Sequence, residues 1–420
     1  MNDGVTESAS RVRHVAVEAT RLLREKRGIG RYVRNLLLQM SLQRPDLRFT
    51  LHVRRPRDQE PLRQQVADMS PALAERCTIA LVAELPRSAA DVVWYPWNWI
   101  NPPARRATMV ATIQDLAPML QFDGRWWKVW KRFKARHRYQ GTADHATLIL
   151  TISTFTSREV KRLLRVDHSK LRVTLLAADD CRIAAGETSE TLERLGIEGP
   201  FFLTVGAHDA RKNLSTLYQA MAVLHARGET VPLVQCGPGV EADSDGRSAP
   251  WMRAAGYVSD AELATLYRRA TALVFPSRYE GFGLPVAEAM LAGGCVICAS
   301  ESSLPEVGGD AALFFPWNDA EALAAQMTRL LHEPGLRDRH AEMGPAQAAK
   351  FSWARCAAET LDVFDEAHGM KRGGGGTAAT ATNGASRDTT GALPSAQTAA
   401  APTVGSRYTR TYSAPPAPGA

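Results

Sequence analysis

Short apolar runs alternate with helical patterns in this chain, and the alternation occurs in two separate series. The first series opens with apolar residues 14–17 and a helical stripe over residues 32–40. The second contains a strand-like run at 201–205, a helical pattern at 214–224 and another strand-like run at 272–275. Strands that alternate with helices form parallel sheets through βαβ units. The sequence therefore predicts an α/β protein with two doubly wound, Rossmann-like domains.

The length of 420 residues agrees with two domains, because single hydrophobic cores stop growing at about 250–300 residues. We expect a first domain over residues 11–181, completed by a returning helix over residues 352–368. The second domain is expected over residues 182–351. From residue 369 the composition changes to Gly, Ala, Thr, Ser and Pro, so residues 369–420 are predicted to be a disordered tail.

Charge and targeting signals limit the class of protein. Residues 1–180 carry a net charge of about +13 and the rest about −6, which together give +7. A basic surface can meet nucleic acid or an anionic membrane, but no nucleic-acid reader motif accompanies it, so no nucleic-acid partner is expected. The first dozen residues are polar and no run reaches the ~18 apolar residues of a spanning helix. The sequence predicts a cytoplasmic protein that can lie peripherally on the inner face of the membrane.

Six scattered cysteines are typical of a reducing compartment rather than of a disulfide scaffold. Cys295 and Cys298 form a CxxC inside an apolar run, which favours a buried strand over redox or zinc chemistry. Gly237-Pro-Gly239 followed by Ala242 imitates a dinucleotide motif. No helical pattern follows it, so an NAD site is rejected.

The segment from Phe275 to Gly293 is the most informative about function. A strand ends near Phe275, a glycine-bearing loop follows, and Pro285 suits the first turn of a helix. Such a loop directs backbone N–H groups and the positive end of a helix toward the crevice where parallel sheets bind phosphates. Glu280 and Glu288 flank this loop and can accept hydrogen bonds from sugar hydroxyls. The segment predicts a diphosphate site with two carboxylates, although two solvated glutamates beside an ordinary turn are the alternative.

The string Glu280-Gly-Phe-Gly-Leu-Pro-Val-Ala-Glu288 resembles the E-x7-E signature of the family 4 retaining glycosyltransferases, which have the GT-B fold. Further strings follow in the family's order over residues 11–367: Gly28-Ile-Gly30-Arg31-Tyr32, Thr112-Ile-Gln114-Asp115-Leu, Val205-Gly206-Ala207-His-Asp-Ala-Arg211-Lys212-Asn213, Gly256-Tyr-Val258-Ser-Asp, and Ser303-Leu-Pro-Glu306-Val-Gly. The resemblance implies two Rossmann-like domains that face each other across a cleft.

By this resemblance, Glu280 contacts a hydroxyl of the donor sugar, and Lys212 with Arg211 neutralises the leaving diphosphate. Glu288 binds the ribose of the nucleotide. Other donor-binding candidates come from the same strings: Gly281, Phe282, Gly283, Leu284, Val258, Gly206, Gln114 and Asp115. The family works without a metal ion or cofactor and retains the anomeric configuration. Its proposed route is a front-face attack in which the departing phosphate oxygen helps to deprotonate the acceptor.

The chain departs from the family at two positions. Gln114 stands where many members have histidine, and an amide donates a hydrogen bond but does not titrate. Ala207 stands where many members have arginine, a charge that Arg211 can supply. Both departures leave open a weakened activity or an altered sugar preference.

Acceptor contacts are expected in the first domain. The candidates are Gly28, Gly30, Arg31, Tyr32, Trp97 and Asn98. The glycines allow close approach of the backbone. The aromatic loop around Trp97 either stacks on sugar rings or packs the loop onto the domain.

A basic aromatic segment over residues 125–138 places Trp126, Trp130 and Phe133 on one helical stripe. Such a helix either lies on an anionic membrane or buries its stripe in the core.

We therefore expect a glycosyltransferase that moves a hexose from a nucleotide-diphosphate sugar to a glycan or lipid-linked acceptor in surface polysaccharide or lipopolysaccharide synthesis. Similarity to polysaccharide mannosyltransferases favours GDP-mannose as the donor. The alternative is a catalytically weakened, nucleotide-sugar-binding scaffold at the membrane, for which Gln114 and Ala207 are the motive.

Overall fold

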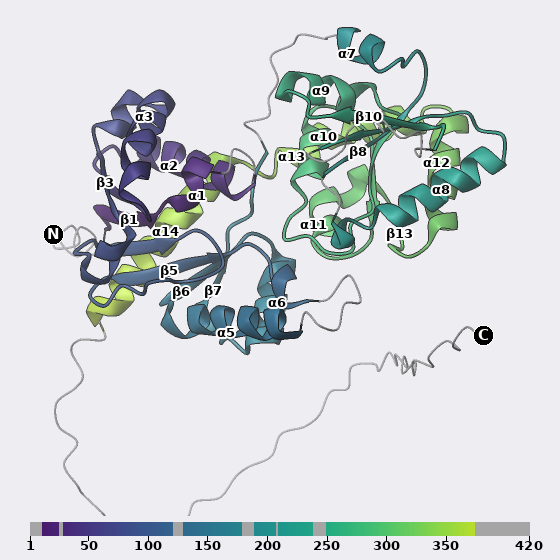
Figure 1. The fold of residues 1–420 in the computed structure, drawn as a ribbon. Coiled ribbons are helices and arrows are strands. Elements are labelled where there is room, and N and C mark those ends of the chain that lie inside the picture. Colours follow the sequence, from purple (N-terminus) through teal and green to yellow (C-terminus); the bar gives the residue numbers. More distant parts are fainter. Residues whose placement is uncertain are drawn as a thin grey trace, which may run out of the picture. The chain divides into compact units, whose positions relative to one another are not determined.

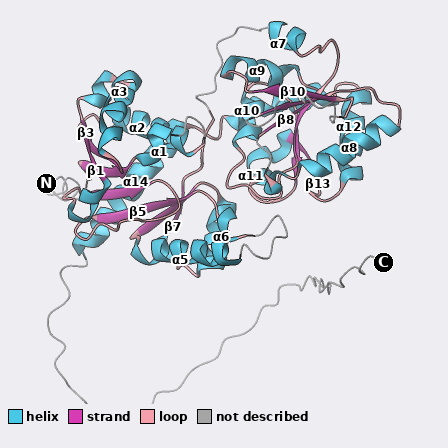
Figure 2. Ribbon diagram, viewed as in Figure 1, coloured by secondary structure: helices cyan, strands magenta, loops and turns pink. Residues whose placement is uncertain are grey.

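A computed structural model describes residues 11–24, 28–120, 129–178, 189–206, 209–237 and 249–373. Ala207, Trp126 and most of the predicted tail, residues 374–420, lie outside the described residues. Two parallel sheets with helices packed around them form the described part of the chain (Figures 1 and 2). The predicted pair of α/β domains is confirmed.

Within the described residues the first sheet has the order β3-β2-β1-β4-β5-β6-β7, with every neighbouring pair parallel. Its strands are β1 (His14–Glu18), β2 (Arg48–Val53), β3 (Cys77–Leu81), β4 (Val92–Tyr95), β5 (Thr108–Ile113), β6 (Leu148–Thr151) and β7 (Leu171–Val173). Successive side chains of β4 point to opposite faces of the sheet. Val92 and Trp94 belong to one core cluster and Val93 and Tyr95 to another, so β4 is buried on both faces.

Helices that connect these strands cover the sheet: α1 (Thr20–Arg24), α2 (Ile29–Gln43), α3 (Gln59–Met69), α4 (Pro71–Ala74), α5 (Val129–His145) and α6 (Thr154–Leu164). Short 3-10 turns lie at Pro56–Asp58, Val82–Arg87, Ala117–Met119 and His168–Lys170. The Ser153 side chain accepts a hydrogen bond from the Thr156 N–H and thereby caps the start of α6.

The second sheet of the described chain has the order β10-β9-β8-β11-β12-β13, again parallel throughout. Its strands are β8 (Phe202–Val205), β9 (Leu233–Cys236), β10 (Met252–Gly256), β11 (Ala272–Phe275), β12 (Val296–Ala299) and β13 (Ala312–Phe315). Cys295 and Cys298 are free and buried at β12, which confirms the core interpretation of the CxxC. Burial raises the pKa of the Cys295 thiol to about 12.

The helices of the second half are α7 (Ser189–Arg194), α8 (Leu214–Ala226), α9 (Asp260–Arg269), α10 (Leu284–Leu291), α11 (Leu304–Gly308), α12 (Ala320–His332) and α13 (Leu336–Ala348), with 3-10 turns at Ala210–Lys212 and Gly309–Ala311. A capping box between Ser259 and Glu262 starts α9.

The last helix, α14 (Trp353–Gly373), returns to the first sheet, where it contacts α2 and the strands β4, β5 and β6 (Figure 1). The Phe364 ring packs at 5.8 Å from the Trp94 ring, and Asp365 accepts hydrogen bonds from the Arg44 guanidinium. The helix extends to Gly373, five residues beyond the predicted end at residue 368, so residues 369–373, which were predicted to begin the disordered tail, are helical.

No helix in the described part of the chain combines the length and apolar character needed to cross a lipid bilayer.

Candidate active site

The candidate site is built on two neighbouring strands of the second sheet, β8 and β11. The strand order reverses between them, since β9 and β10 lie beyond β8 while β12 and β13 lie beyond β11. Loops that leave the carboxyl ends of two such strands diverge and open a ligand crevice. The loop after β8 carries Arg211 and Lys212, and the loop after β11 carries Glu280. The Arg278 N–H donates to the Arg211 carbonyl at 2.8 Å and so ties the two loops together.

Glu280 is the centre of a charged cluster in this crevice. It is only 7% exposed, and its Oε1 lies 2.7 Å from Lys212 Nζ. Its Oε2 lies 3.6 Å from Arg211 Nη1. Burial acts to lower the pKa of the Arg211 guanidinium, but the carboxylates of Glu280, Asp115 and Asp209 outweigh it and raise that pKa. Lys212 and Arg211 therefore both lie beside Glu280, and Arg211 Nε also lies 3.3 Å from Asp209 Oδ2.

The glycine loop between Glu280 and α10 is shaped by close contacts. A Cβ on Gly281 would lie 2.1 Å from the Gln114 carbonyl oxygen, so any side chain there displaces backbone. Gly283 has φ 106° at the N-cap of α10, a conformation that favours glycine. Ser303 Oγ donates to the carbonyls of Glu280 and Phe282 at 3.0 and 2.7 Å. The loop is thus held in one conformation, ahead of the positive end of an eight-residue helix.

Phe282 and Leu284 contribute differently to this loop. The Phe282 side chain is 2% exposed and meets Phe351 edge-on at 5.4 Å, so its ring belongs to the core. Leu284, the first residue of α10, is partly buried. The Phe282 ring is therefore not placed to meet a ligand.

Glu288 lies in the second turn of α10 and is 9% exposed. Its Oε2 accepts a hydrogen bond from the Tyr267 hydroxyl at 3.0 Å, and its Oε1 lies 2.5 Å from Arg31 Nη1. Neither Glu280 nor Glu288 is a solvated surface carboxylate, so the alternative of an ordinary turn is wrong.

Gln114 and Asp115 follow β5 of the first sheet and reach the second half of the chain. Gln114 donates through Nε2 to the Pro96 carbonyl at 3.1 Å, while its N–H donates to Asn98 Oδ1 at 2.7 Å. The Gln114 amide is therefore engaged with the loop after β4. Burial raises the pKa of Asp115, and the nearby Arg211 opposes that rise.

The expected acceptor residues separate into two groups. Gly28, with φ 62°, is the N-cap residue of α2, and Arg31 lies in the first turn of that helix. Tyr32 and Trp97, in contrast, are 1% and 3% exposed. Tyr32 packs against Trp94 and its hydroxyl lies 3.3 Å from Thr112 Oγ1. The structure brings neither aromatic ring to the surface.

Asn98 and Gly30 are also buried, and Asn98 adopts φ 40° where its side chain orders the Gln114 backbone. Among the remaining donor candidates, Val258 is 2% exposed, and Gly206 (φ 138°) lies where a Cβ would come within 3.7 Å of Lys212 Cε. That distance is ordinary van der Waals contact, so the positive φ of Gly206, and not lack of space, is what favours glycine there.

Helix α5 does not bury its aromatic stripe. Trp130 and Phe133 are 81% and 65% exposed and touch each other edge-on. The core interpretation of these two rings is wrong, because α5 packs through Ala135 and Tyr139 on another face.

Sequence reasoning missed several residues that build the site. Tyr267 gave no signal, because it lies in an ordinary amphipathic pattern on α9. Thr156 donates to the Gly281 carbonyl at 3.1 Å, and Tyr279 accepts from the Leu116 N–H at 3.2 Å. Ser303 and Glu306 belong to a string already noted, which signalled their importance but not their contacts.

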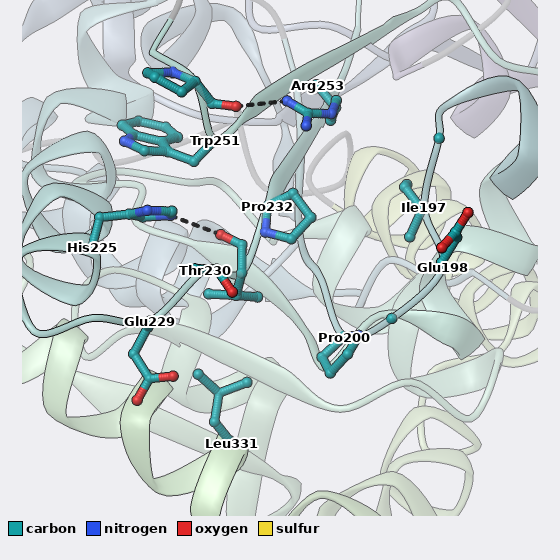
Figure 3. A pocket seen from close by; sticks show the side chains of 14 residues that line it. Ile197, Glu198, Pro200, His225, Glu229, Thr230, Pro232, Trp251, Arg253 and Leu331 are labelled. Atoms are coloured by element: carbon teal, nitrogen blue, oxygen red, sulfur yellow. Dashed lines mark hydrogen bonds between the residues drawn. The ribbon is translucent and has the colours of Figure 1, made fainter.

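A pocket of about 590 Å³ lies elsewhere, at the amino ends of β8 and β9, where Pro200 and Pro232 precede the strands (Figure 3). Trp251, His225 and Glu229 contribute to its wall, and the His225 ring stacks on Trp251. None of the predicted site residues lines it. Because ligands of parallel sheets bind at the carboxyl ends of the strands, this pocket is not the candidate active site.

Comparison with known proteins supports a glycosyltransferase domain in the second half of the chain. The profile of a family described as "Glycosyl transferases group 1" matches residues 189–347. The chain is 36% identical over 233 residues to O-antigen chain mannosyltransferase B of Escherichia coli, covering 53% of this chain and 61% of that protein. It is 28% identical over 236 residues to the serotype-specific mannosyltransferase WbdA of Escherichia coli, covering 53% of this chain and 29% of that protein. The chain thus spans less than two thirds of these relatives.

Solved structures show the same fold. Sucrose-phosphate synthase from Thermosynechococcus elongatus matches with a TM-score of 0.64 at 16% identity, over 86% of this chain and 100% of the other. Anabaena Alr3699/HepE, solved with UDP and glucose, matches with a TM-score of 0.62 at 13% identity, over 85% and 100%. These matches confirm the predicted GT-B architecture.

Proposed function

We propose that this chain transfers a hexose from a nucleotide-diphosphate sugar to a glycan or lipid-linked acceptor in surface polysaccharide synthesis. The match of residues 189–347 to the profile of the glycosyl transferases group 1 supports this proposal. The similarity to mannosyltransferases of the O-antigen supports the polysaccharide product. One observation carries the proposal: Glu280 is a buried carboxylate that contacts Lys212 and Arg211. The three residues lie on the loops after β8 and β11, where the strand order reverses.

The donor diphosphate is proposed to lie at the start of α10, where the helix dipole and the backbone of residues 281–284 favour an anion. Lys212 and Arg211 then stand on its other side and supply two positive charges. Glu280 accepts a hydrogen bond from a hydroxyl of the donor sugar, and Glu288 accepts hydrogen bonds from the ribose. Val258, Gly206, Gln114 and Asp115 line the donor site through backbone and packing contacts.

The proposed reaction retains the anomeric configuration. The bond between the anomeric carbon and the phosphate oxygen breaks, and a bond to the acceptor oxygen forms on the same face of the sugar. The departing phosphate oxygen takes the proton of the acceptor hydroxyl, so the nucleoside diphosphate leaves with that proton. Arg211 and Lys212 stabilise the charge that develops on the phosphate as the bond breaks. We propose that these two side chains replace a metal ion and that no cofactor takes part.

GDP-mannose is the proposed donor, since the similar Escherichia coli proteins are named mannosyltransferases. Melting curves with GDP, UDP and ADP compare the nucleotides directly, because a ligand at a hundredfold excess over its Kd stabilises a protein by ~2.7 kcal/mol. Greater stabilisation by UDP than by GDP would contradict GDP-mannose as the donor and favour a UDP-sugar.

A weakened, nucleotide-binding scaffold is the second candidate function. The observation that favours it is the Gln114 amide, which donates to the Pro96 carbonyl and so is turned to the protein backbone. The scaffold predicts nucleotide binding without sugar transfer to any acceptor.

The Glu280→Ala variant tests the enzymatic proposal. We expect it to keep GDP-dependent stabilisation but to lose at least about 100-fold in kcat, since the charged cluster acts on the transition state. The measurement is release of GDP from GDP-mannose in the presence of a mannan-type oligosaccharide. Glu342→Gln, a change at an exposed carboxylate of α13, is the matched control. Equal turnover in Glu280→Ala and wild type would refute the assignment, and absence of turnover in wild type favours the scaffold.

We also propose that helix α5 binds an anionic membrane surface, where a lipid-linked acceptor is held. Val129, Trp130 and Phe133 are exposed apolar side chains at its start. Exposed cations Lys131 and Lys134 lie between and beside them. Aromatic rings that insert at the headgroup level and lysines that meet anionic lipids are the features of an interfacial helix.

The Trp130→Ala/Phe133→Ala variant is expected to lower partition onto phosphatidylglycerol-containing vesicles about tenfold or more, since two rings lose their apolar burial. Cosedimentation with vesicles measures the partition, and added salt should weaken wild-type binding. Leu42→Ala removes a comparably exposed apolar side chain, 71% exposed on α2, and should change nothing. Equal wild-type binding to neutral and anionic vesicles would contradict the proposal.

A further inference from the structure

The carboxylate proposed to bind ribose is held by a residue from the other half of the chain. Arg31 Nη1 lies 2.5 Å from Glu288 Oε1, and the two side chains are 13% and 11% exposed. The Tyr267 hydroxyl donates to the second oxygen, Oε2, at 3.0 Å. Glu288 is thus held by two side chains, Arg31 of α2 and Tyr267 of α9.

The position of Arg31 is unfavourable for its own helix. It is the third residue of α2, and the first turn of α2 contains no acidic residue. The positive end of the helix dipole repels a cation in this turn. The arginine partner is instead a carboxylate 257 residues away in the sequence. Local helix stability therefore does not explain why a cation stands here, whereas the contact with Glu288 does.

An ionised carboxylate has about four lone-pair sites, and Glu288 meets Arg31 through Oε1 and Tyr267 through Oε2. In the proposed complex the 2′ and 3′ hydroxyls of a ribose are further donors to the same two oxygens. A carboxylate already oriented by two donors loses less conformational freedom when it binds a ligand.

We propose that Arg31 is a positioning residue for the nucleotide, which orients Glu288 for the two ribose hydroxyls rather than contacting the acceptor. This inference rests on the proposed function, because it takes Glu288 as the ribose ligand. It predicts that Arg31 affects donor affinity and not the chemical step. The ligand class is a nucleoside diphosphate with free 2′ and 3′ hydroxyls.

The test measures the Kd of GDP and of 2′,3′-dideoxy-GDP for the full chain by calorimetry. Arg31→Ala should weaken GDP binding about 10- to 100-fold, the usual effect of losing a charge-assisted hydrogen bond. The dideoxy analogue, which lacks both hydroxyls, should bind wild type and Arg31→Ala within about threefold of each other. Arg31→Lys should restore part of the GDP affinity. Arg34→Ala, an exposed arginine one turn further along α2, is the matched control and should bind GDP as wild type does.

A double-mutant cycle separates an effect through Glu288 from a direct contact. In a Glu288→Ala background, Arg31→Ala should cost no further affinity, because the side chain that it orients is gone. Additive losses, or an equal loss for the dideoxy analogue, would mean that Arg31 touches the nucleotide itself and would overturn the inference. A raised KM for the donor with unchanged kcat is the matching kinetic result, and a fall in kcat alone would also overturn it.

Failure of the proposed function gives a different pattern. If wild type binds no nucleoside diphosphate, the proposed donor site is wrong and the inference falls with it. Melting curves without ligand show whether each variant is folded. If Arg31→Ala is unfolded, Tyr267→Phe and Arg31→Lys test the same orientation, and unchanged GDP affinity in both would contradict it.

Discussion

Glu18 is a buried carboxylate that the proposed mechanism does not use. It ends β1, the strand beside the order reversal of the first sheet, and is 1% exposed. The Thr20 hydroxyl donates to it. Burial raises its pKa from 4.5 to about 7, and Thr20, Arg54 and Arg21 only partly oppose the rise. The folded protein therefore keeps a proton on Glu18 at pH values where the unfolded chain has lost it.

Glu18 should make the protein less stable as the pH rises from about 4.5 to about 7. Over this range the folded state binds more protons than the unfolded state, so the free energy of unfolding falls, by at most ~3 kcal/mol for this one group. The Glu18→Gln variant carries no titrating group. We expect its melting temperature relative to wild type to be higher at pH 8 than at pH 5. A difference that is the same at both pH values would show that Glu18 does not titrate there.

Helix α6 starts against a short helix of the second half, and this contact positions the glycine loop. Glu306 of α11 accepts hydrogen bonds from the Thr154 N–H at 3.0 Å, the Thr154 hydroxyl at 2.7 Å and the Phe155 N–H at 3.3 Å. One residue later, Thr156 donates to the Gly281 carbonyl. A carboxylate at a helix start complements the dipole and the free N–H groups of the first turn.

Removal of this carboxylate should destabilise the protein at the level of a lost helix cap. Glu306→Ala is expected to lower the free energy of unfolding by about 1–2 kcal/mol. Glu306→Gln, which keeps an acceptor oxygen, should cost less. Urea denaturation provides the measurement, with Asp310→Ala at a nearby exposed carboxylate as the control. A loss in Glu306→Ala no larger than that of the control would mean that the three hydrogen bonds contribute little in solution.

At the scale of the whole molecule, the sequence predicted the two sheets because central strands such as β4, β11 and β12 are buried along their whole length and form continuous apolar runs. It also predicted that Glu280 and Glu288 flank a glycine loop, since that pattern is local. The contact between Arg31 and Glu288 spans 257 residues and depends on how the halves pack, which no local pattern encodes. The burial of Tyr32 and Trp97 was equally inaccessible, because the same aromatic composition serves packing and sugar stacking. The domain boundaries at residues 181 and 351 stay predictions.

The return of α14 to the first sheet sets the order of events during synthesis. Trp94 and Tyr32 pack against Phe364 and Trp353, which leave the ribosome more than 250 residues later. Until then, the apolar face of the first sheet that α14 covers is exposed to solvent. If synthesis stops before residue 353, the first half of the chain is complete but this apolar face stays exposed. Such a chain can bind chaperones or aggregate.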